Sequence, residues 1–386
     1  MEIQSIAVLG GGNGAHALAA DLALQGYEVY MYELPEFAEK FQATLKSQSI
    51  SIAPVFGPEL PEKYKVPQGV ARLKKATTNI KEALEKAQVI IVCCPAYGHK
   101  AFAETLAPHI RDGQIILLTP GSLGSIEFRN IFKKKGITTN VKIAETAILP
   151  YGTRMTGPCE VRAIIPIEVR FAAYPSRDTK QLFEFLKPLI RGLAPAENVL
   201  ATTLINGNCV QHPPVLLLNV GNVEKMKEVY LYRDWTSESV ALLMDELDEE
   251  KKKLCDFLNM DYVMRYYLVF GNGLEIIHKD GLSFVGKPGD RYRYGDGLGA
   301  KYLSELAFSL IEGPHSVKDR MFTEDVPFGM LPAVSLGRFF KIDMPVCESI
   351  ITLTSKICRQ AFRSLGRTLA GLGINFNSSE ELRSKL

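Results

Sequence analysis

IAVLGGGNGAHALAADLALQGYEVYMYE, residues 6–33, decides the fold of this chain. The stretch reads as an apolar strand at residues 6–9, a glycine turn, a helix at residues 15–24 and a second strand that ends on Glu33. Strand, turn, helix, strand and acid in this order match the G-x-G-x-x-A form of the dinucleotide-binding fingerprint. The stretch therefore predicts a Rossmann fold with a bound dinucleotide.

The fingerprint requires each of its small residues for a separate physical reason. Gly10 allows a tight turn out of the strand, Gly12 lets a pyrophosphate approach the backbone, and Ala15 lets the helix pack close to the sheet. The helix N-terminus, which carries Asn13 and Gly14, presents free N–H groups and a partial positive charge to the phosphates. We expect these five residues to bind the cofactor.

Glu33 indicates which dinucleotide is bound. It lies 23 positions after Gly10, near the spacing of about 20 that places an acid on the adenosine ribose. A carboxylate there accepts hydrogen bonds from the ribose hydroxyls and repels a 2′-phosphate. Because no Arg or Lys occurs between Glu33 and Lys40 to receive such a phosphate, the sequence favours NAD, with NADP as the alternative.

Later strand ends are expected near the nicotinamide half of the cofactor, because a parallel sheet binds ligands at the carboxyl ends of its strands. The apolar strand at residues 87–94 ends in Pro95, which we expect to contact the cofactor. Strands at 114–118 and 141–144 lead into residues 119–122 and Glu145. Proline and glycine are also common at the ends of strands that have no functional role.

The two halves of the chain differ in pattern. The first half alternates strands and helices, which predicts a doubly wound parallel sheet (α/β), with further strands at 161–165 and 169–173. The second half is predicted to be mostly helical (all-α). We therefore expect a Rossmann domain at residues 1–198 and a helical domain at 199–386. The expected helices of the second half lie at 214–222, 238–258, 262–270, 300–310, 331–340 and 347–366, with a glycine-rich loop at 286–299.

Composition excludes several other classes of protein. The 386 residues include 46% hydrophobic and 23% charged residues, and the net charge is only +2, so bulk charge indicates no nucleic-acid or membrane surface. No apolar run reaches transmembrane length and no leader is apparent, so a cytoplasmic protein is expected. The six His and seven Cys show no metal-ligand spacing. The lysine runs at 133–135 and 251–253 are expected to be solvated helix faces. A homodimer is among the assemblies that the sequence allows.

Residues 206–214, NGNCVQHPP, contain the first catalytic candidate. A Pro-Pro step favours the start of a helix and restricts the backbone of the residue before it, here His212. Histidine exchanges protons near neutral pH, and hydride transfer to a carbonyl or an imine needs a proton source. The alternative is a helix start with an incidental histidine, and the local sequence does not decide between the two.

Residues 320–327, RMFTEDVP, contain the second candidate. Arg320 offers a bidentate fork for a substrate carboxylate, and Asp325 is of the type that holds an imidazole in one tautomer. Taken locally, a surface charge cluster with an aspartate helix cap is the more common explanation.

Taken together, the motifs resemble the opine dehydrogenases, the octopine/nopaline dehydrogenase family. The resemblance covers nearly the whole chain in the right order. The residues that carry it are GGGNGAH at 10–16, PAYGH at 95–99, Glu145-Thr146, LPYGTR at 149–154, Asn208, HPP at 212–214, Asn219, YRD at 232–234, Thr236, residues 320–327 and LGR at 336–338.

The resemblance implies a Rossmann domain and a helical domain with the active site in the cleft. It implies reductive condensation of an α-keto acid, most commonly pyruvate in this family, with the amino group of an amino acid, using NADH or NADPH. A catalytic His–Asp pair falls on His212 and Asp325, and a substrate-carboxylate arginine falls on Arg320, with Asn208 as a further substrate-binding residue. Glu324 stays an alternative partner for the histidine.

Two other functions fit parts of the pattern. The same scaffold reduces 2-keto acids to 2-hydroxy acids without an amine, and the motifs of the first half do not separate the two reactions. A regulatory protein that binds NAD without turnover would keep the fingerprint but need not keep His212, Arg320 and Asp325 together. The expected partners are therefore small molecules, a keto acid and an amino acid.

Overall fold

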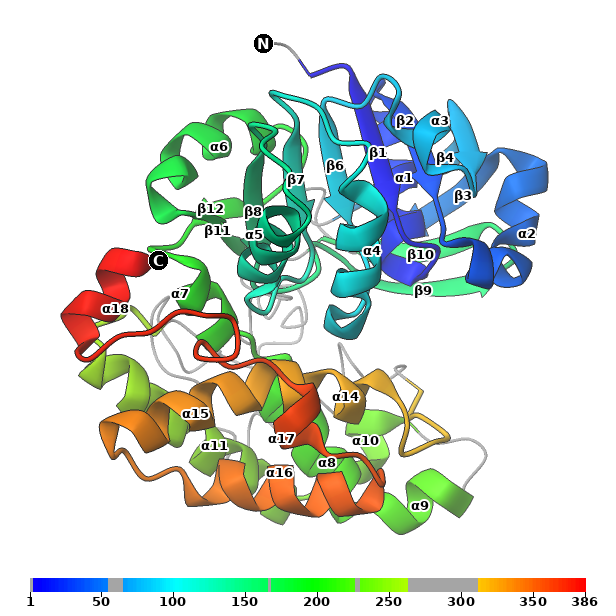
Figure 1. Ribbon diagram of the computed structural model, residues 1–386. Helices are drawn as coiled ribbons and strands as arrows, with labels where there is room; N and C mark the ends of the chain where they lie inside the picture. Colours follow the sequence, from blue (N-terminus) through cyan, green and yellow to red (C-terminus); the bar gives the residue numbers. More distant parts are fainter. Residues whose placement is uncertain (1–2, 55–64, 166–167, 226–229, 263–311) are drawn as a thin grey trace, which may run out of the picture. The chain divides into compact units, whose positions relative to one another are not determined.

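The chain forms two compact units, shown in Figure 1. In the computed structural model one unit contains the described residues up to Thr202 together with Leu386, and the other runs from Thr203 to Lys385. The domain boundary at 198/199 stays a prediction. The structure describes residues 3–54, 65–165, 168–225, 230–262 and 312–386. The helices expected at 300–310 and over most of 262–270, and the loop at 286–299, lie outside the described residues.

The first unit is built on an eight-stranded sheet. The central strands are buried over their whole length, as their continuous apolar sequences predict for strands covered on both faces. The strand order is β12 (Leu193–Pro195), β11 (Val169–Tyr174), β8 (Lys142–Thr146), β7 (Ile115–Leu118), β6 (Val89–Val92), β1 (Ser5–Leu9), β2 (Glu28–Tyr32) and β5 (Lys75–Thr77).

Helices cover both faces of this sheet, as the doubly wound prediction requires. Ile6 and Val8 of β1 belong to one core together with residues of α1 and α6, whereas Ala7 and Leu9 belong to the opposite core with residues of α4 and α5. The alternation follows from the two-residue period of a strand. The helices of this unit are α1 (Asn13–Leu24), α2 (Ala38–Ser47), α3 (Ile80–Leu84), α4 (His99–Leu106), α5 (Gly124–Lys134), α6 (Thr179–Leu186) and α7 (Val199–Leu204).

The sheet departs from the fully parallel prediction at one edge. β11 runs antiparallel to β8, and the strand expected at 161–165 belongs to a separate four-stranded sheet. Between β8 and β11 the chain passes through the antiparallel pair at 152–157 and 160–164 of that separate sheet, and it returns to the large sheet in the opposite direction. The small sheet packs on α1, and its order is β4 (Gly69–Arg72), β3 (Ser49–Pro54), β10 (Glu160–Ile164) and β9 (Gly152–Gly157).

The second unit consists mainly of helices in its described part. Residues 331–340 form the expected helix, and the helix expected at 238–258 ends one residue earlier. The elements are α8 (Asn208–Leu218), α9 (Val220–Lys225), α10 (Leu231–Trp235), α11 (Glu238–Phe257), α14 (Arg320–Thr323), the π-helix η8 (Asp325–Met330), α15 (Leu331–Phe340), α16 (Pro345–Ile357), α17 (Phe362–Leu365) and α18 (Ser379–Lys385).

Two sequence predictions for the second unit were wrong in detail. The single helix expected at 347–366 is divided into α16 and α17, because Arg359 takes a left-handed conformation (φ 54°) that ends the first helix. The run at 251–253 is not a uniformly solvated face, because Lys251 is only 1% exposed. By contrast, Lys133 and Lys134 are exposed in the last turn of α5, as expected.

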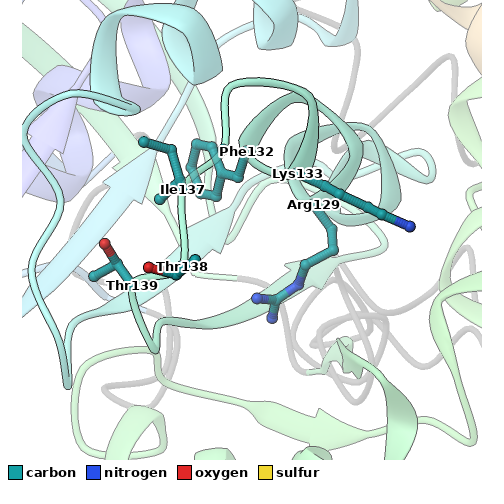
Figure 2. Close-up of a pocket in the computed structure, with 7 residues that line it drawn as sticks. Arg129, Phe132, Lys133, Ile137, Thr138 and Thr139 are labelled. Atoms are coloured by element: carbon teal, nitrogen blue, oxygen red, sulfur yellow. The ribbon is translucent and has the colours of Figure 1, made fainter.

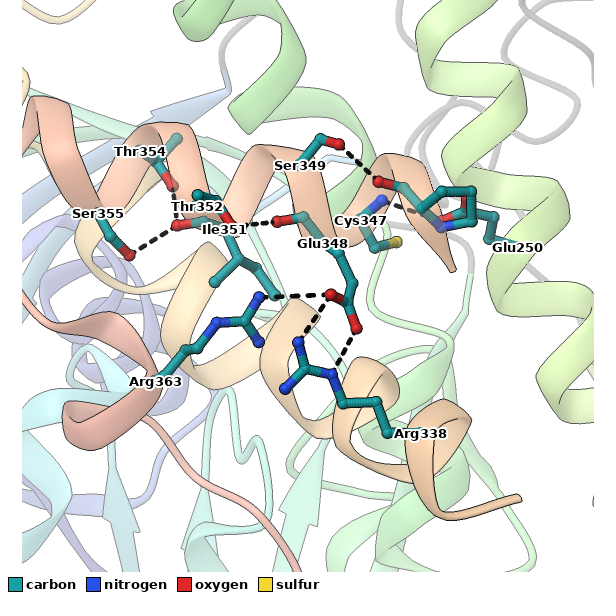
Figure 3. Close-up of polar contacts among 11 residues, drawn as sticks. Glu250, Arg338, Cys347, Glu348, Ser349, Ile351, Thr352, Thr354, Ser355 and Arg363 are labelled. Carbon is teal, nitrogen blue, oxygen red and sulfur yellow. Dashed lines mark hydrogen bonds and ion pairs between the residues drawn. The ribbon is translucent and has the colours of Figure 1, made fainter. Parts of the chain in front are cut away.

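Charged side chains fix helix ends in this unit, as Figure 3 shows. The buried Glu250 carboxylate of α11 accepts hydrogen bonds from the N–H groups of Val346 and Cys347 in the first turn of α16 (2.8 and 2.9 Å). An anion at a helix N-terminus satisfies unpaired donors and complements the helix dipole. Arg338 of α15 forms an ion pair with Glu348 of α16, which also lies near Arg363.

Candidate active site

The glycine turn after β1 depends on the absence of a side chain at Gly10. Its φ is +122°, and its N–H donates to the carbonyl oxygen of Tyr32 (2.8 Å). A Cβ added here would lie 2.3 Å from the carbonyl oxygen of Cys93 on the neighbouring strand end. Both the backbone conformation and the close approach therefore require glycine.

The residues after the turn form the N-terminus of α1. Gly12 is the N-cap residue and has extended backbone, with no side-chain cap and no acidic residue in the first turn. Ala15 is fully buried against the sheet, and the Asn13 Oδ1 accepts a hydrogen bond from the N–H of Met155 (3.3 Å). Gly14 faces Leu149 and the Cys93 sulfur so closely that a side chain would collide with them.

Glu33 follows β2 directly, as the fingerprint predicts. One oxygen accepts a hydrogen bond from the N–H of Leu34 (2.8 Å), and a Cβ at Gly11 would lie 2.7 Å from the other oxygen. Burial raises the pKa of Glu33, and hydrogen bonds from the Leu34 and Gly11 amides oppose this effect. The acid therefore lies beside the glycine turn, where ribose hydroxyls can donate to it.

These residues fit a dinucleotide. A Cβ at Gly12 would meet none of the described atoms within 4 Å, so the space over the turn is open where a pyrophosphate needs to approach. The open position lies at the N-terminus of a 12-residue helix, which favours an anion. The buried His16 ring helps to fix the turn, because its nitrogens contact the Gly12 carbonyl oxygen (3.0 Å) and the Thr44 hydroxyl (2.8 Å).

Strand ends at the same edge of the sheet carry further polar groups. Pro95 follows β6 and is the N-cap residue of the short helix η3 (Ala96–Gly98). The Glu145 carboxylate at the end of β8 is fully buried and accepts from the N–H groups of Leu123 and Ser125 (2.9 Å each). Glu145 thus fixes the loop after β7, a role that the sequence pattern did not indicate.

His99 of the PAYGH motif has a structural role. Its side chain is fully buried, with its ring edge-on to Phe128 and close to Gly124 of α5. It packs α4 against α5.

A surface pocket of about 310 Å³ lies elsewhere on the first unit. Figure 2 shows Arg129, Phe132 and Lys133 coming from α5, with Thr138 and Thr139 from the segment that leads to β8. This is the C-terminal end of α5, whereas the N-terminus of the helix lies at the edge that holds Glu145. The pocket is therefore separate from the dinucleotide site.

The structure corrects the predicted start of the helix that carries His212. Helix α8 begins at Asn208, so Pro213 and Pro214 lie inside it rather than at its first turn. Interior prolines each remove a backbone hydrogen bond and cost about 3 kcal/mol. The helix forms because its start is well satisfied: the Gly207 carbonyl oxygen accepts from the N–H groups of Val210 and Gln211.

His212 and Asp325 form a buried pair. The Nδ1 of His212 lies 2.7 Å from the Oδ2 of Asp325, although 113 residues separate them in the sequence. Asp325 is the first residue of the π-helix η8, an uncommon structure that is often found at functional sites. Glu324, the alternative partner, instead has an oxygen 3.9 Å from the Nη1 of Arg320.

The other two predicted substrate residues lie on helices next to this pair. Arg320 begins α14 and is partly exposed, whereas Glu324 beside it is buried. Asn208 begins α8, one turn before His212, so both lie on one side of the helix. Within the described residues no group of three or more His, Cys, Asp or Glu side chains is arranged to hold a metal ion.

The His–Asp pair depends on the close approach of two helices. A Cβ added at Gly329 of η8 would lie 2.0 Å from the sulfur of Cys209 in α8. Burial raises the pKa of Cys209 to about 12, so this thiol stays neutral and acts as a packing group. Gly329 therefore lets η8 reach α8, and Cys209 fills the space between them.

Comparison with known proteins agrees with this arrangement. Residues 195–358 match the family described as NAD/NADP octopine/nopaline dehydrogenase, alpha-helical domain, and residues 5–119 match the family described as NADP oxidoreductase, coenzyme F420-dependent. An opine dehydrogenase of Arthrobacter sp. (strain 1C) is 30% identical over 389 residues, covering 100% of this chain and 99% of the relative.

Solved structures of octopine dehydrogenase share the fold. One, with NADH and L-arginine, superimposes with a TM-score of 0.71 at 18% identity and covers 99% of this chain and 98% of that one. Another, with NADH and pyruvate, gives a TM-score of 0.68 at 19% identity and covers 96% of each chain.

A Rossmann unit with an acid-terminated fingerprint and a helical unit with a buried His–Asp pair define a two-domain NAD(P)-dependent dehydrogenase. The chain belongs to the opine dehydrogenase family. It is an oxidoreductase that acts on the CH–NH group of its donors, and the reaction of the family is the reductive condensation of an α-keto acid with an amino acid. Among the described residues no helix is long and apolar enough to span a bilayer.

The two glycines of the fingerprint should respond differently to a methyl group. Gly10→Ala should lower the free energy of unfolding by about 1–3 kcal/mol or more, because it combines a positive φ with a backbone collision. Gly12→Ala should keep the thermal midpoint but weaken NADH binding at least about tenfold, because the methyl occupies the open space over the turn. Thermal unfolding and NADH fluorescence titration measure both effects, and equal destabilisation by the two variants would contradict this account.

The contact between α8 and η8 predicts a repair experiment. Gly329→Ala should cost about 1–3 kcal/mol of stability through overpacking and lower kcat about 10–100-fold by moving Asp325 from His212. Adding Cys209→Ala removes the colliding sulfur, so the double variant should regain kcat to within about threefold of the Cys209→Ala single variant. Failure of the double variant to recover would show that the sulfur contact does not set the spacing.

Proposed function

We propose that this enzyme condenses pyruvate with the amino group of an amino acid, uses NADH as its reductant, and employs His212 as its acid–base residue. The hydrogen bond of 2.7 Å between His212 and Asp325 carries the proposal. The full-length relationship to an opine dehydrogenase supports it, as does the fold shared with an octopine dehydrogenase structure that holds NADH and pyruvate.

In the proposed mechanism the two ring nitrogens of His212 have different roles. An ionised carboxylate only accepts hydrogen bonds, so Nδ1 carries a proton toward Asp325 and Nε2 is the nitrogen that exchanges a proton with the substrate. When the ring is doubly protonated, the buried carboxylate stabilises the imidazolium. Asp325 thereby fixes both the tautomer and the orientation of the ring.

The chemistry then proceeds in two stages. The amine attacks the keto carbon and water leaves, which gives an imine; His212 moves the protons that this dehydration needs. The nicotinamide, when bound, supplies the hydride that reduces the imine carbon. His212 donates a proton to the imine nitrogen as the hydride reaches the carbon, so the product is a secondary amine with two carboxylates.

Arg320 is proposed to hold a substrate carboxylate. The Arg320 side chain is 41% exposed, so a ligand can reach it. The buried Glu324, with an oxygen 3.9 Å from the Nη1 of Arg320, limits the orientation of the guanidinium. A guanidinium offers paired donors that match a carboxylate. Asn208, one turn before His212, is proposed as a neutral hydrogen-bonding group for the same substrate.

The choice of NADH rests on Glu33. A carboxylate beside the glycine turn accepts from both ribose hydroxyls but repels a 2′-phosphate, and its neighbour Glu36 adds negative charge. We also propose a domain boundary at 198/199 and a cytoplasmic location. All seven cysteines are thiols rather than parts of disulfides, which is typical of a reducing compartment.

Amine-dependent turnover tests the proposed function. NADH oxidation should require both pyruvate and an amino acid, should be faster than with NADPH, and should yield a secondary-amine dicarboxylate identifiable by mass. Turnover with pyruvate alone would instead indicate a 2-hydroxy acid dehydrogenase. Tight NADH binding without turnover on any combination of keto acid and amine would indicate a binding protein.

Substitutions in the pair separate the two adjacent acids. His212→Asn and Asp325→Asn should each lower kcat by about 10²–10⁴-fold at neutral pH, because proton transfer and ring orientation are lost. Glu324→Gln is the matched control, since this carboxylate is equally buried but faces Arg320; it should raise the KM for the keto acid and lower kcat by less than about tenfold. Near-normal kcat for His212→Asn would refute the assigned role.

A further inference from the structure

Lys251 is a buried cation that the proposed reaction does not use. It lies in the middle of α11 and is only 1% exposed, although both neighbouring lysines of the same run reach solvent. Burying an ammonium group costs several kcal/mol unless hydrogen bonds compensate. A lysine in this position therefore suggests a specific role for its charge.

The ammonium group reaches the turn that starts α8. Its Nζ donates to the carbonyl oxygen of Asn206 (2.9 Å), and this residue is itself buried. The Oδ1 of Asn206 accepts from the N–H of Asn208 (3.0 Å), the first residue of the helix. Lys251 thus fixes the backbone of the turn at Asn206. The Asn206 side chain in turn fixes the first residue of α8.

Helix α8 depends on this turn more than an ordinary helix would. Pro213 and Pro214 lack N–H groups, so the carbonyl oxygens of Cys209 and Val210 lose their helical donors. The segment around His212 is therefore fixed less by its own hydrogen bonds and more by the helix start and by tertiary contacts. Any shift of the turn moves His212, which lies only one turn after Asn208.

The charges around α8 also place Lys251 on the catalytic side of this unit. The Cys209 thiol of α8 feels the positive charge of Lys251 from α11 and the negative charges of Asp325 and Glu324, which act on its pKa in opposite directions. The preceding Glu250 serves a different helix, because its carboxylate binds the first turn of α16 (Figure 3). The adjacent residues Glu250 and Lys251 of α11 therefore fix the N-termini of two different helices, α16 and α8.

We propose that Lys251 is a positioning residue for His212, acting through the Asn206 carbonyl at the start of α8. The inference rests on the proposed role of His212. It assigns to Lys251 no contact with substrate or cofactor. It explains why one lysine of an otherwise solvated run is buried.

The test compares Lys251→Met with the wild-type enzyme. The variant keeps most of the length of the side chain but removes the donor, so kcat should fall about 10–100-fold while the KM for the keto acid changes less than about threefold. The NADH dissociation constant, which depends on the glycine turn of the other unit, should not change. Lys251→Arg retains a donor and should recover part of kcat, which a purely apolar packing role would not allow.

Two control variants make the result specific. Lys253→Met removes an exposed charge two positions away and should leave kcat unchanged. Glu250→Gln removes the adjacent buried charge and should lower the thermal midpoint with a smaller effect on kcat. If Glu250→Gln lowered kcat as much as Lys251→Met at the same loss of thermal midpoint, the effect would be general loosening and the proposal would fail.

The outcome is separable from that of the proposed function. A wild-type enzyme without amine-dependent turnover would refute the function itself. An active wild type in which His212→Asn is inactive but Lys251→Met keeps normal kcat would refute only the positioning role. If Lys251→Met does not fold, Lys251→Arg decides: a folded variant that keeps at least about a tenth of the wild-type kcat supports a requirement for the donor, and a folded variant without measurable kcat contradicts it.

Discussion

The close approach of α8 and the π-helix η8 is the contact on which the candidate active site depends. A residue without a side chain, Gly329, meets the sulfur of Cys209, and the same two helices carry the hydrogen bond between His212 and Asp325. The wider π-helix and the two interior prolines of α8 leave both elements short of ordinary α-helical bonding. Their geometry is therefore determined by packing between helices more than within them.

The dinucleotide site of the other unit follows the same principle. Gly10 lies against the carbonyl oxygen of Cys93, which fixes the turn relative to the next strand, while the space above Gly12 stays open. In both units a missing side chain lets two backbones approach, and a polar group is then presented with little freedom. Hydride and proton donors need such fixed positions, because misplacement by about 1 Å can cost two orders of magnitude in rate.

The features that could be predicted from the sequence are those encoded within one short stretch of residues. The fingerprint gave the first strand, turn, helix and Glu33, because every part of it lies within 28 consecutive residues. The pairing of His212 with Asp325 rather than Glu324 needed tertiary geometry, since 113 residues separate the partners. The start of α8 was misplaced because a Pro-Pro step normally marks a first turn. Lys251 was assigned to solvent because a lysine run carries no sign of which member the fold buries.

The contact between Cys209 and Gly329 also restricts the order in which substitutions at these two positions can accumulate. While a sulfur occupies position 209, any side chain at position 329 collides with it, so the two positions are not free to change in either order. A smaller residue must appear at 209 before 329 can accept a methyl group. The order of changes in this helix pair is therefore constrained, and the two positions should covary among descendants of a common ancestor.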